Sequence, residues 1–102
     1  MKTIWKYNLN DNRKVCGPII EFLTLQMQRD DPCVWALVDT NKPNKTFLFN
    51  VIGTGFPMVE GFDKYLGTIQ MGGGDFVFHI FYTEVNNKES EKNLWSNMAL
   101  KI

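Results

Sequence analysis

Residues 65–83 read YLGTIQMGGGDFVFHIFYT, and this stretch decides the class of fold. From Phe76 onward, bulky apolar residues occupy every second position, and a mixed row of residues lies between them. A period of two is typical of a β-strand. The glycines from Gly72 to Gly74 precede this strand and follow another at 65–71, and glycine adopts the positive φ angles of a tight turn at low cost. The stretch therefore predicts two strands joined by a tight turn.

The remainder of the chain continues the same pattern. Further strands are predicted at residues 3–9, 21–28, 33–38 and 46–52. The strand at 33–38 is apolar on both faces, which suits a central strand covered on both sides. Residues 58–64 are expected to be a connection. Trp5 and Trp35 occupy strand positions from which aromatic side chains normally enter the core.

The C-terminal segment has a different period. Leu94, Trp95, Met98 and Ile102 follow a polar run at helical spacing, which predicts a short amphipathic helix at about 90–100. The predicted fold is mainly β: an antiparallel sheet of five to six strands curled into a small barrel or sandwich, with this helix added. Residues 1–84 would form the compact β domain and residues 85–102 a helical extension. Because exposed Trp and Met are common interface anchors, the four apolar residues are the candidate site for self-docking, dimerisation or partner binding.

Composition excludes several classes of function. The chain has 102 residues, with 11 Lys and Arg against 11 Asp and Glu, so it lacks the basic excess typical of nucleic-acid binding. No apolar run reaches the roughly 18–20 residues that span a membrane. The N-terminus has no apolar signal segment, which predicts a cytoplasmic protein. In that reducing compartment Cys16 and Cys33 are expected to be free, mostly buried thiols.

Little catalytic chemistry is visible. His79 is the only histidine, and it is expected to be a strand residue satisfied by a nearby polar group. An enzyme that pairs His79 with a carboxylate is a minor alternative. One His and two Cys without motif spacing do not form a zinc site. The sequence predicts no metal, no cofactor and no catalytic residue.

The segment Gly53-Thr54-Gly55 is the candidate ligand site. Two glycines let backbone amides approach an anion, and the Thr54 hydroxyl can add a hydrogen bond. Trp35 would supply an aromatic wall. The alternative is structural, because two glycines after a strand usually mark a bend or bulge.

Four blocks of the chain together resemble a known family. They are MKTIWKY at residues 1–7, PCVWALVD at 32–39, VIGTGFP at 51–57 and YLGTIQMGGGDFVFHIF at 65–81. They resemble a family of small phage- and prophage-encoded proteins classed as a domain of unknown function. Residues 10–20 depart from that pattern, and the tail from Tyr82 extends beyond it. The resemblance implies a phage setting and a compact β-rich fold, and it carries no established catalytic residues.

These observations predict a non-enzymatic phage accessory protein that acts by binding. It would bind and neutralise a host factor, such as a defence component, in the cytoplasm of a bacterial host cell. The partner would be a host or phage protein, with self-association through the helix as an alternative. A second hypothesis is a small-ligand binder that sequesters an anionic or nucleotide molecule at Gly53–Gly55. A third is a structural module.

Overall fold

Seven strands and one helix form the part of the chain that the structure describes. The computed structural model describes residues 1–10 and 13–99. The elements are β1 (Lys2–Asn8), β2 (Lys14–Gly17), β3 (Ile19–Gln28), β4 (Asp31–Asp39), β5 (Lys45–Gly53), β6 (Lys64–Met71), the 3₁₀ turn η1 (Gly72–Gly74), β7 (Phe76–Val85) and α1 (Lys88–Ala99). The predicted connection at 58–64 has no helical turn. All three glycines of η1 have positive φ, as the tight turn requires.

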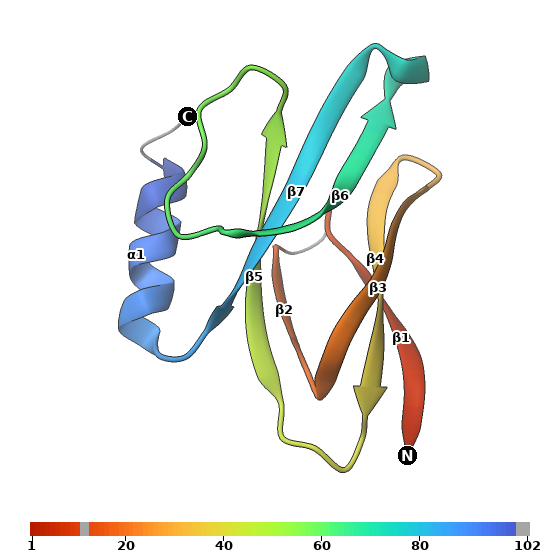
Figure 1. Ribbon diagram of the computed structural model, residues 1–102, viewed down its shortest axis with the longest axis vertical. Helices are drawn as coiled ribbons and strands as arrows, with labels where there is room; N and C mark the ends of the chain where they lie inside the picture. Colours follow the sequence, from red (N-terminus) through yellow and green to blue (C-terminus); the bar gives the residue numbers. More distant parts are fainter. Residues whose placement is uncertain (11–12, 100–102) are drawn as a thin grey trace.

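The strands form two antiparallel sheets (Figure 1). One has the order β1-β4-β3 and the other has the order β2-β5-β7-β6. The chain changes sheet at Pro18, between β2 and β3, and the Pro18 carbonyl accepts a hydrogen bond from the N–H of Asp39 at 3.0 Å. The prediction of a mainly β, antiparallel fold with a C-terminal helix is confirmed. Strand β2 was not predicted, because four residues are too few to show a period.

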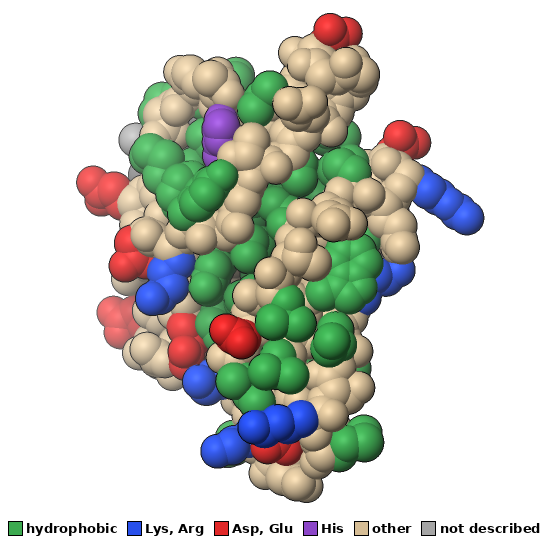
Figure 2. All heavy atoms as spheres, turned by 45° about the vertical axis from the view of Figure 1, so that its right-hand side comes forward, with side chains coloured by type: hydrophobic (Ala, Val, Ile, Leu, Met, Phe, Trp, Pro, Cys, Tyr) green, Lys and Arg blue, Asp and Glu red, His purple; other side chains and the backbone are tan. Residues whose placement is uncertain are grey.

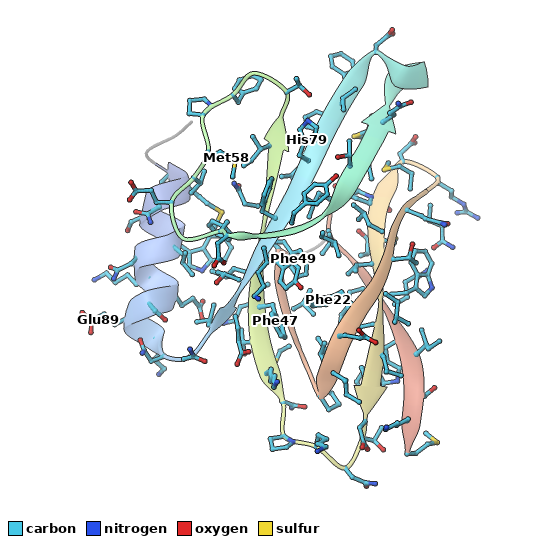
Figure 3. The ribbon with its side chains drawn as sticks, viewed as in Figure 1. Phe22, Phe47, Phe49, Met58, His79 and Glu89 are labelled. Atoms are coloured by element: carbon cyan, nitrogen blue, oxygen red, sulfur yellow. The ribbon has the colours of Figure 1, made fainter. Side chains whose placement is uncertain are left out.

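The main core lies between the two sheets. Its fully buried members include Val34 and Val38 of β4 and Phe49 of β5. The Phe22 ring of β3 reaches across to β5 and β7, edge-on to Phe47, Phe49 and Tyr82 with centroid distances of 5.0–5.2 Å (Figure 3). Aromatic pairs in this geometry add about 0.5–1.5 kcal/mol beyond the area that they bury. These contacts hold the two sheets together.

A second core cluster lies on the other face of the four-stranded sheet. Leu94 of α1 packs there against Leu48, Val59, Phe62 and Val85 and is only 8% exposed. The loop between β5 and β6 covers the same face, and the Asn97 amide donates to the Glu60 carbonyl of this loop at 3.1 Å. The helix therefore docks on its own sheet. Among the described residues, the main core contains no residue of the helix, whereas the second cluster includes Leu94.

Trp5 does not enter the core as predicted. It pairs with the buried Ala36, so it points to the inner face of its sheet, yet 41% of it remains exposed. Trp5 lies on β1, which is an edge strand of its sheet. Both cysteines are free thiols, but only Cys33 is buried, and Cys16 is exposed.

Candidate functional site

The segment Gly53-Thr54-Gly55 forms a tight turn at the end of β5. The N–H of Phe56 donates to the Gly53 carbonyl at 3.1 Å, which closes a four-residue turn. Gly55 is its third residue and has a φ of +91°, as a type II turn requires. The N–H of Thr54 donates to the Val77 carbonyl at 3.2 Å. Two of the amides that an anion would need are thus already used, and the geometry favours the structural alternative.

Trp35 does not join this turn. It lies on β4 opposite Lys6, on the outer face of the three-stranded sheet, whereas Gly53 pairs with Phe78 in the four-stranded sheet. The predicted grouping of an aromatic wall with the glycine turn is therefore not formed.

Two adjoining depressions flank the turn instead. We call them together the aromatic groove. The first has a volume of about 280 Å³ and is lined by Asn50, Val51, Ile52, Gly53, Phe56, Pro57, Val59, Phe78 and Met98. The second has a volume of about 530 Å³ and is lined by Gly53, Thr54, Phe56, Asp75, Phe76, Val77 and Phe78. Gly53, Phe56 and Phe78 belong to both, so the two depressions meet at the turn.

Large apolar side chains stand exposed around the aromatic groove. Phe56 is 71% exposed and Phe76 is 60% exposed. Met58, on the loop that carries Phe56, is also exposed but lines neither depression. Figure 3 shows Met58 on the loop that passes between the four-stranded sheet and α1. Single exposed apolar residues are ordinary, but a group around one depression is typical of a binding surface.

Asn50 supplies a polar group to the first depression. Its side chain is 8% exposed, and its Nδ2 atom has no hydrogen-bond partner among the residues that the structure describes. A buried amide donor without a partner costs about 1–3 kcal/mol. Because this atom has almost no surface open to solvent, an acceptor would reach it only after the Asn50 side chain rotates.

The charge of the aromatic groove does not suit an anion. No Lys or Arg is among the described residues that line either depression, and the one ionisable side chain there is the carboxylic acid of Asp75. An occupant with an apolar body and an uncharged acceptor fits this surface better than a phosphate.

His79 lies beside the groove on β7. Its Nε2 atom is 2.7 Å from Thr54 Oγ1, and its Nδ1 atom is 2.9 Å from Thr68 Oγ1. Thr68 in turn hydrogen-bonds the Tyr65 hydroxyl. Figure 2 shows the imidazole, in purple, reaching the surface. A neutral imidazole is fully satisfied if Nε2–H donates to Thr54 and Nδ1 accepts from Thr68, which agrees with the predicted strand role.

The residues predicted as a tail site take different positions. Leu94 is buried in the second core cluster, and Met98 packs against that cluster while lining the groove. Trp95 is 40% exposed, and its indole N–H donates to Glu91 at 3.1 Å. Ile102 lies outside the described residues. The four residues therefore do not form one exposed stripe in the part of the chain that is described.

Glu91 ties the helix to β2. Its carboxylate lies 3.0 Å from the Lys14 ammonium. Hydrogen bonds from Lys14 and then from Trp95 hold the pKa of Glu91 below its usual value. Trp95 thus helps to fix a contact within the chain, and its outer side remains exposed.

Sequence reasoning missed Asn50, Phe56 and Phe76 as members of one site. They come from the middle of β5, the following loop and the start of β7, and no local spacing connects them. The only signal was the glycine turn itself, which marks where these segments meet.

The described residues contain neither a candidate metal site nor a candidate membrane-spanning helix. No group of three or more His, Cys, Asp or Glu side chains is placed to hold a metal ion among them. In the same residues there is no helix with the length and apolar character needed to cross a membrane.

Comparison with known proteins places the chain in a family. The model of the family described as "Domain of unknown function (DUF7352)" matches residues 1–91. The match extends past the predicted limit of about residue 81, through the end of β7 and into α1. The comparison with curated proteins and the comparison with solved structures each give no significant match. Since the family model covers most of the sequence, the chain belongs to this family of unknown function.

Proposed function

We propose that this protein acts by binding a host protein through the aromatic groove, and that it performs no catalysis. The observation that carries the proposal is the exposure of Phe56 and Phe76 on either side of one depression. Aromatic side chains that are exposed in the free protein and buried on association are typical interface anchors. An apolar side chain of the partner would fill the space between the two rings.

The protein would be encoded by a phage and would act in the cytoplasm of a bacterial host. This part of the proposal rests on the resemblance of the four sequence blocks to phage and prophage proteins. Binding would neutralise the partner, and a component of host defence is the class we favour. The hydrogen bonds of His79 are consistent with a structural role in the sheet, because both ring nitrogens contact Thr hydroxyls of neighbouring segments and, among the described residues, no carboxylate hydrogen-bonds the ring to orient it.

The test is a set of affinity captures from bacterial host cells. The bait is the full chain, compared with the double variant Phe56→Ser/Phe76→Ser and with the control Ile20→Ser. Ile20 is also exposed but lies in a bulge of β3, in the other sheet. We expect one host protein to be captured by the wild type and the control and lost with the double variant. A protein that the double variant still captures would refute the groove as its binding site.

Trp95→Ala separates the groove from the helix. If the partner is lost with Trp95→Ala and retained with the double variant, the helix is the binding surface and the proposal is wrong. Thermal unfolding of each variant shows whether a lost interaction merely reflects a lost fold.

Asn50 gives a second, independent readout. Replacing it with leucine removes a buried amide that has no partner among the described residues, so Asn50→Leu should raise the free energy of unfolding. If the partner supplies an acceptor to this amide, the same change weakens binding although the protein is more stable. Unchanged affinity would show that the partner does not reach Asn50.

A small uncharged ligand is the second candidate occupant. The unpartnered Asn50 amide favours it, because Asn50 lines the 280 Å³ depression and a rotation of its side chain would bring the buried donor to one acceptor on an apolar molecule there. Native mass spectrometry of protein purified from host cells would show such a ligand as a discrete added mass, absent from Asn50→Leu. A spectrum with the bare chain alone would count against it.

A further inference from the structure

A second surface lies on the other sheet, at the free edge of β1. In the three-stranded sheet β1 pairs with β4 on one side only. Seven residues, Lys2–Asn8, continue along this edge in unbroken register, without proline. An uncovered edge of this length presents a row of backbone groups to which another strand can pair.

The hydrogen bonds at the two ends of β1 show which of its backbone N–H and C=O groups point toward β4 and which point outward. The N–H of Leu9 donates to Pro32 at 2.9 Å, and Met1 accepts from the N–H of Thr40 at 2.9 Å. In an antiparallel pair the residues that bond the partner strand alternate with those that point away. Odd-numbered residues therefore bond β4. The backbone N–H and C=O groups of Ile4 and Lys6 point outward.

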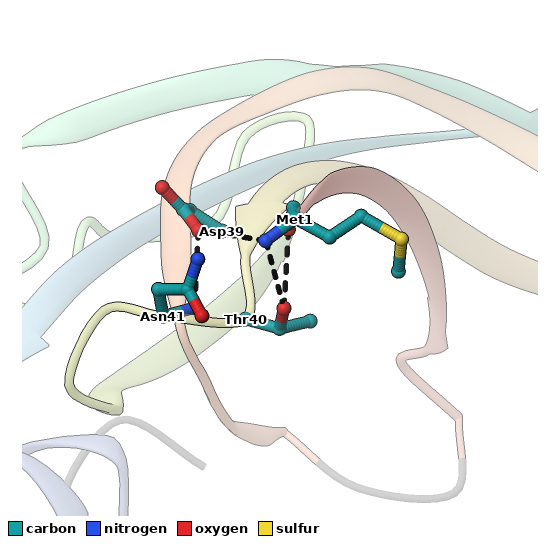
Figure 4. A network of polar contacts seen from close by, with 4 residues as sticks. All are labelled: Met1, Asp39, Thr40 and Asn41. Atoms are coloured by element: carbon teal, nitrogen blue, oxygen red, sulfur yellow. Dashed lines mark hydrogen bonds and ion pairs between the residues drawn. The ribbon is translucent and has the colours of Figure 1, made fainter.

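Both ends of β1 are fixed by side chains as well. The Met1 amine contacts Thr40 Oγ1 at 3.2 Å and Asp39 at 3.5 Å (Figure 4). At the other end the Asn8 amide donates to Asp31 at 2.9 Å. The edge is thus held in one register, so a strand that pairs with it would not have to order β1 first.

The side chains of β1 define what such a strand must carry. Ile4 is 55% exposed on the outer face, and Trp5 is 41% exposed on the inner face. Lys2 and Lys6 flank Ile4 on the outer face, and neither forms an ion pair with any residue that the structure describes. Figure 2 shows hydrophobic side chains on this side of the molecule bordered by Lys and Arg side chains.

We propose that β1 accepts an added β-strand from a second protein, with acidic residues opposite Lys2 and Lys6 and apolar residues between them. A second copy of this chain fits less well, because antiparallel pairing of two β1 strands would place four lysines on one short ribbon. Lysine on an edge also guards against self-pairing. Protection against self-pairing explains why two lysines lie on this edge, but it does not explain why Ile4 and Trp5 beside them are exposed.

The test is titration of the full chain with a capped peptide, STEVVTES, which places its glutamates opposite the two lysines. The control peptide STKVVTKS has the same apolar residues and the opposite charge. We expect STEVVTES to slow hydrogen exchange of the Ile4 and Lys6 amides in NMR spectra, and STKVVTKS to bind at least about tenfold more weakly. Lys6→Glu should abolish the preference between the two peptides, and the double variant Lys2→Glu/Lys6→Glu should reverse it.

Lys6→Pro tests the backbone directly. It removes an outward N–H and no bond to β4, so the other sheet resonances should persist. The control is Lys6→Ala, which removes the same ammonium but keeps the N–H, and STEVVTES should bind Lys6→Pro more weakly than Lys6→Ala. The proposal is overturned if both peptides leave the Ile4 and Lys6 amides unprotected at about 1 mM, a concentration that detects even weak binding. It is equally overturned if those amides become protected as the chain alone dimerises.

Discussion

The helix packs closely against the loop between β5 and β6 where Leu94 contacts Gly61. Replacing each of these two residues with alanine tests that contact. Gly61 lies in the loop between β5 and β6 with a φ of +97°. A Cβ atom at this position would collide with Cδ2 of Leu94. The loop and the helix approach each other this closely only because residue 61 has no side chain.

The magnitudes follow from burial and from the collision. Leu94→Ala removes three carbon atoms from a side chain that is only 8% exposed. At about 0.8 kcal/mol per buried carbon, plus the cost of a cavity, the free energy of unfolding should fall by about 2–4 kcal/mol. Gly61→Ala costs about 1 kcal/mol for a side chain at positive φ, and about 1–3 kcal/mol more for overpacking.

The double variant isolates the contact. Without the Leu94 side chain the new methyl group has no atom to collide with. The sum of the two single losses in the free energy of unfolding should therefore exceed the loss in the double variant by about 1–3 kcal/mol. Gly55→Ala is the matched control, because Gly55 also has positive φ but a Cβ atom there would meet no described atom within 4 Å. Urea unfolding of the wild type, the two single variants, the double variant and the control gives the values. Costs that add to within about 0.5 kcal/mol would show that Gly61 and Leu94 do not touch.

Three further outcomes are expected. The pKa of Glu91 is lowered in the folded protein, chiefly by Lys14, so its stabilisation is present above a pH of about 4.5 and is lost as the pH falls through the lowered pKa. Unfolding measured from pH 6 to about 2.5 should therefore be less pH-dependent in Glu91→Gln than in the wild type. Gly55→Ala should leave any weak affinity for phosphate unchanged, and calorimetric titration with phosphate checks this. Alkylation of the native protein without reductant should label Cys16 rapidly and Cys33 only after unfolding; a mass lower by two hydrogens would instead indicate a disulfide.

The strands were predicted from the alternation of residue types along the sequence. This prediction worked best where the residues on both faces of a strand form a recognisable pattern. In β7, Ile80 and its neighbours at every second position face the main core, while Phe81 faces the second cluster, as the period implies. The same rule assigned Trp5 to the correct face of β1, but the prediction that Trp5 enters the core was wrong. Alternation decides which face a side chain occupies, whereas its burial depends on whether another sheet covers that place.

The candidate site was harder to predict, because it is made by tertiary contacts. The glycines at 53 and 55 indicated the turn. They did not indicate that the Thr54 and Phe56 amides donate hydrogen bonds within the chain, which leaves these two amides unavailable to an anion. Asn50 gave no signal at all, since a polar residue within a strand usually faces solvent. Only the packing of the loop and the helix over β5 buries it.

Hydrogen–deuterium exchange of the chain, free and bound to the host protein that it captures, locates the binding surface most directly. Binding through the aromatic groove predicts slower exchange at residues 53–58 and 75–78 in the complex. Protection confined to α1 or to β1, with those two segments unchanged, would contradict binding at the groove.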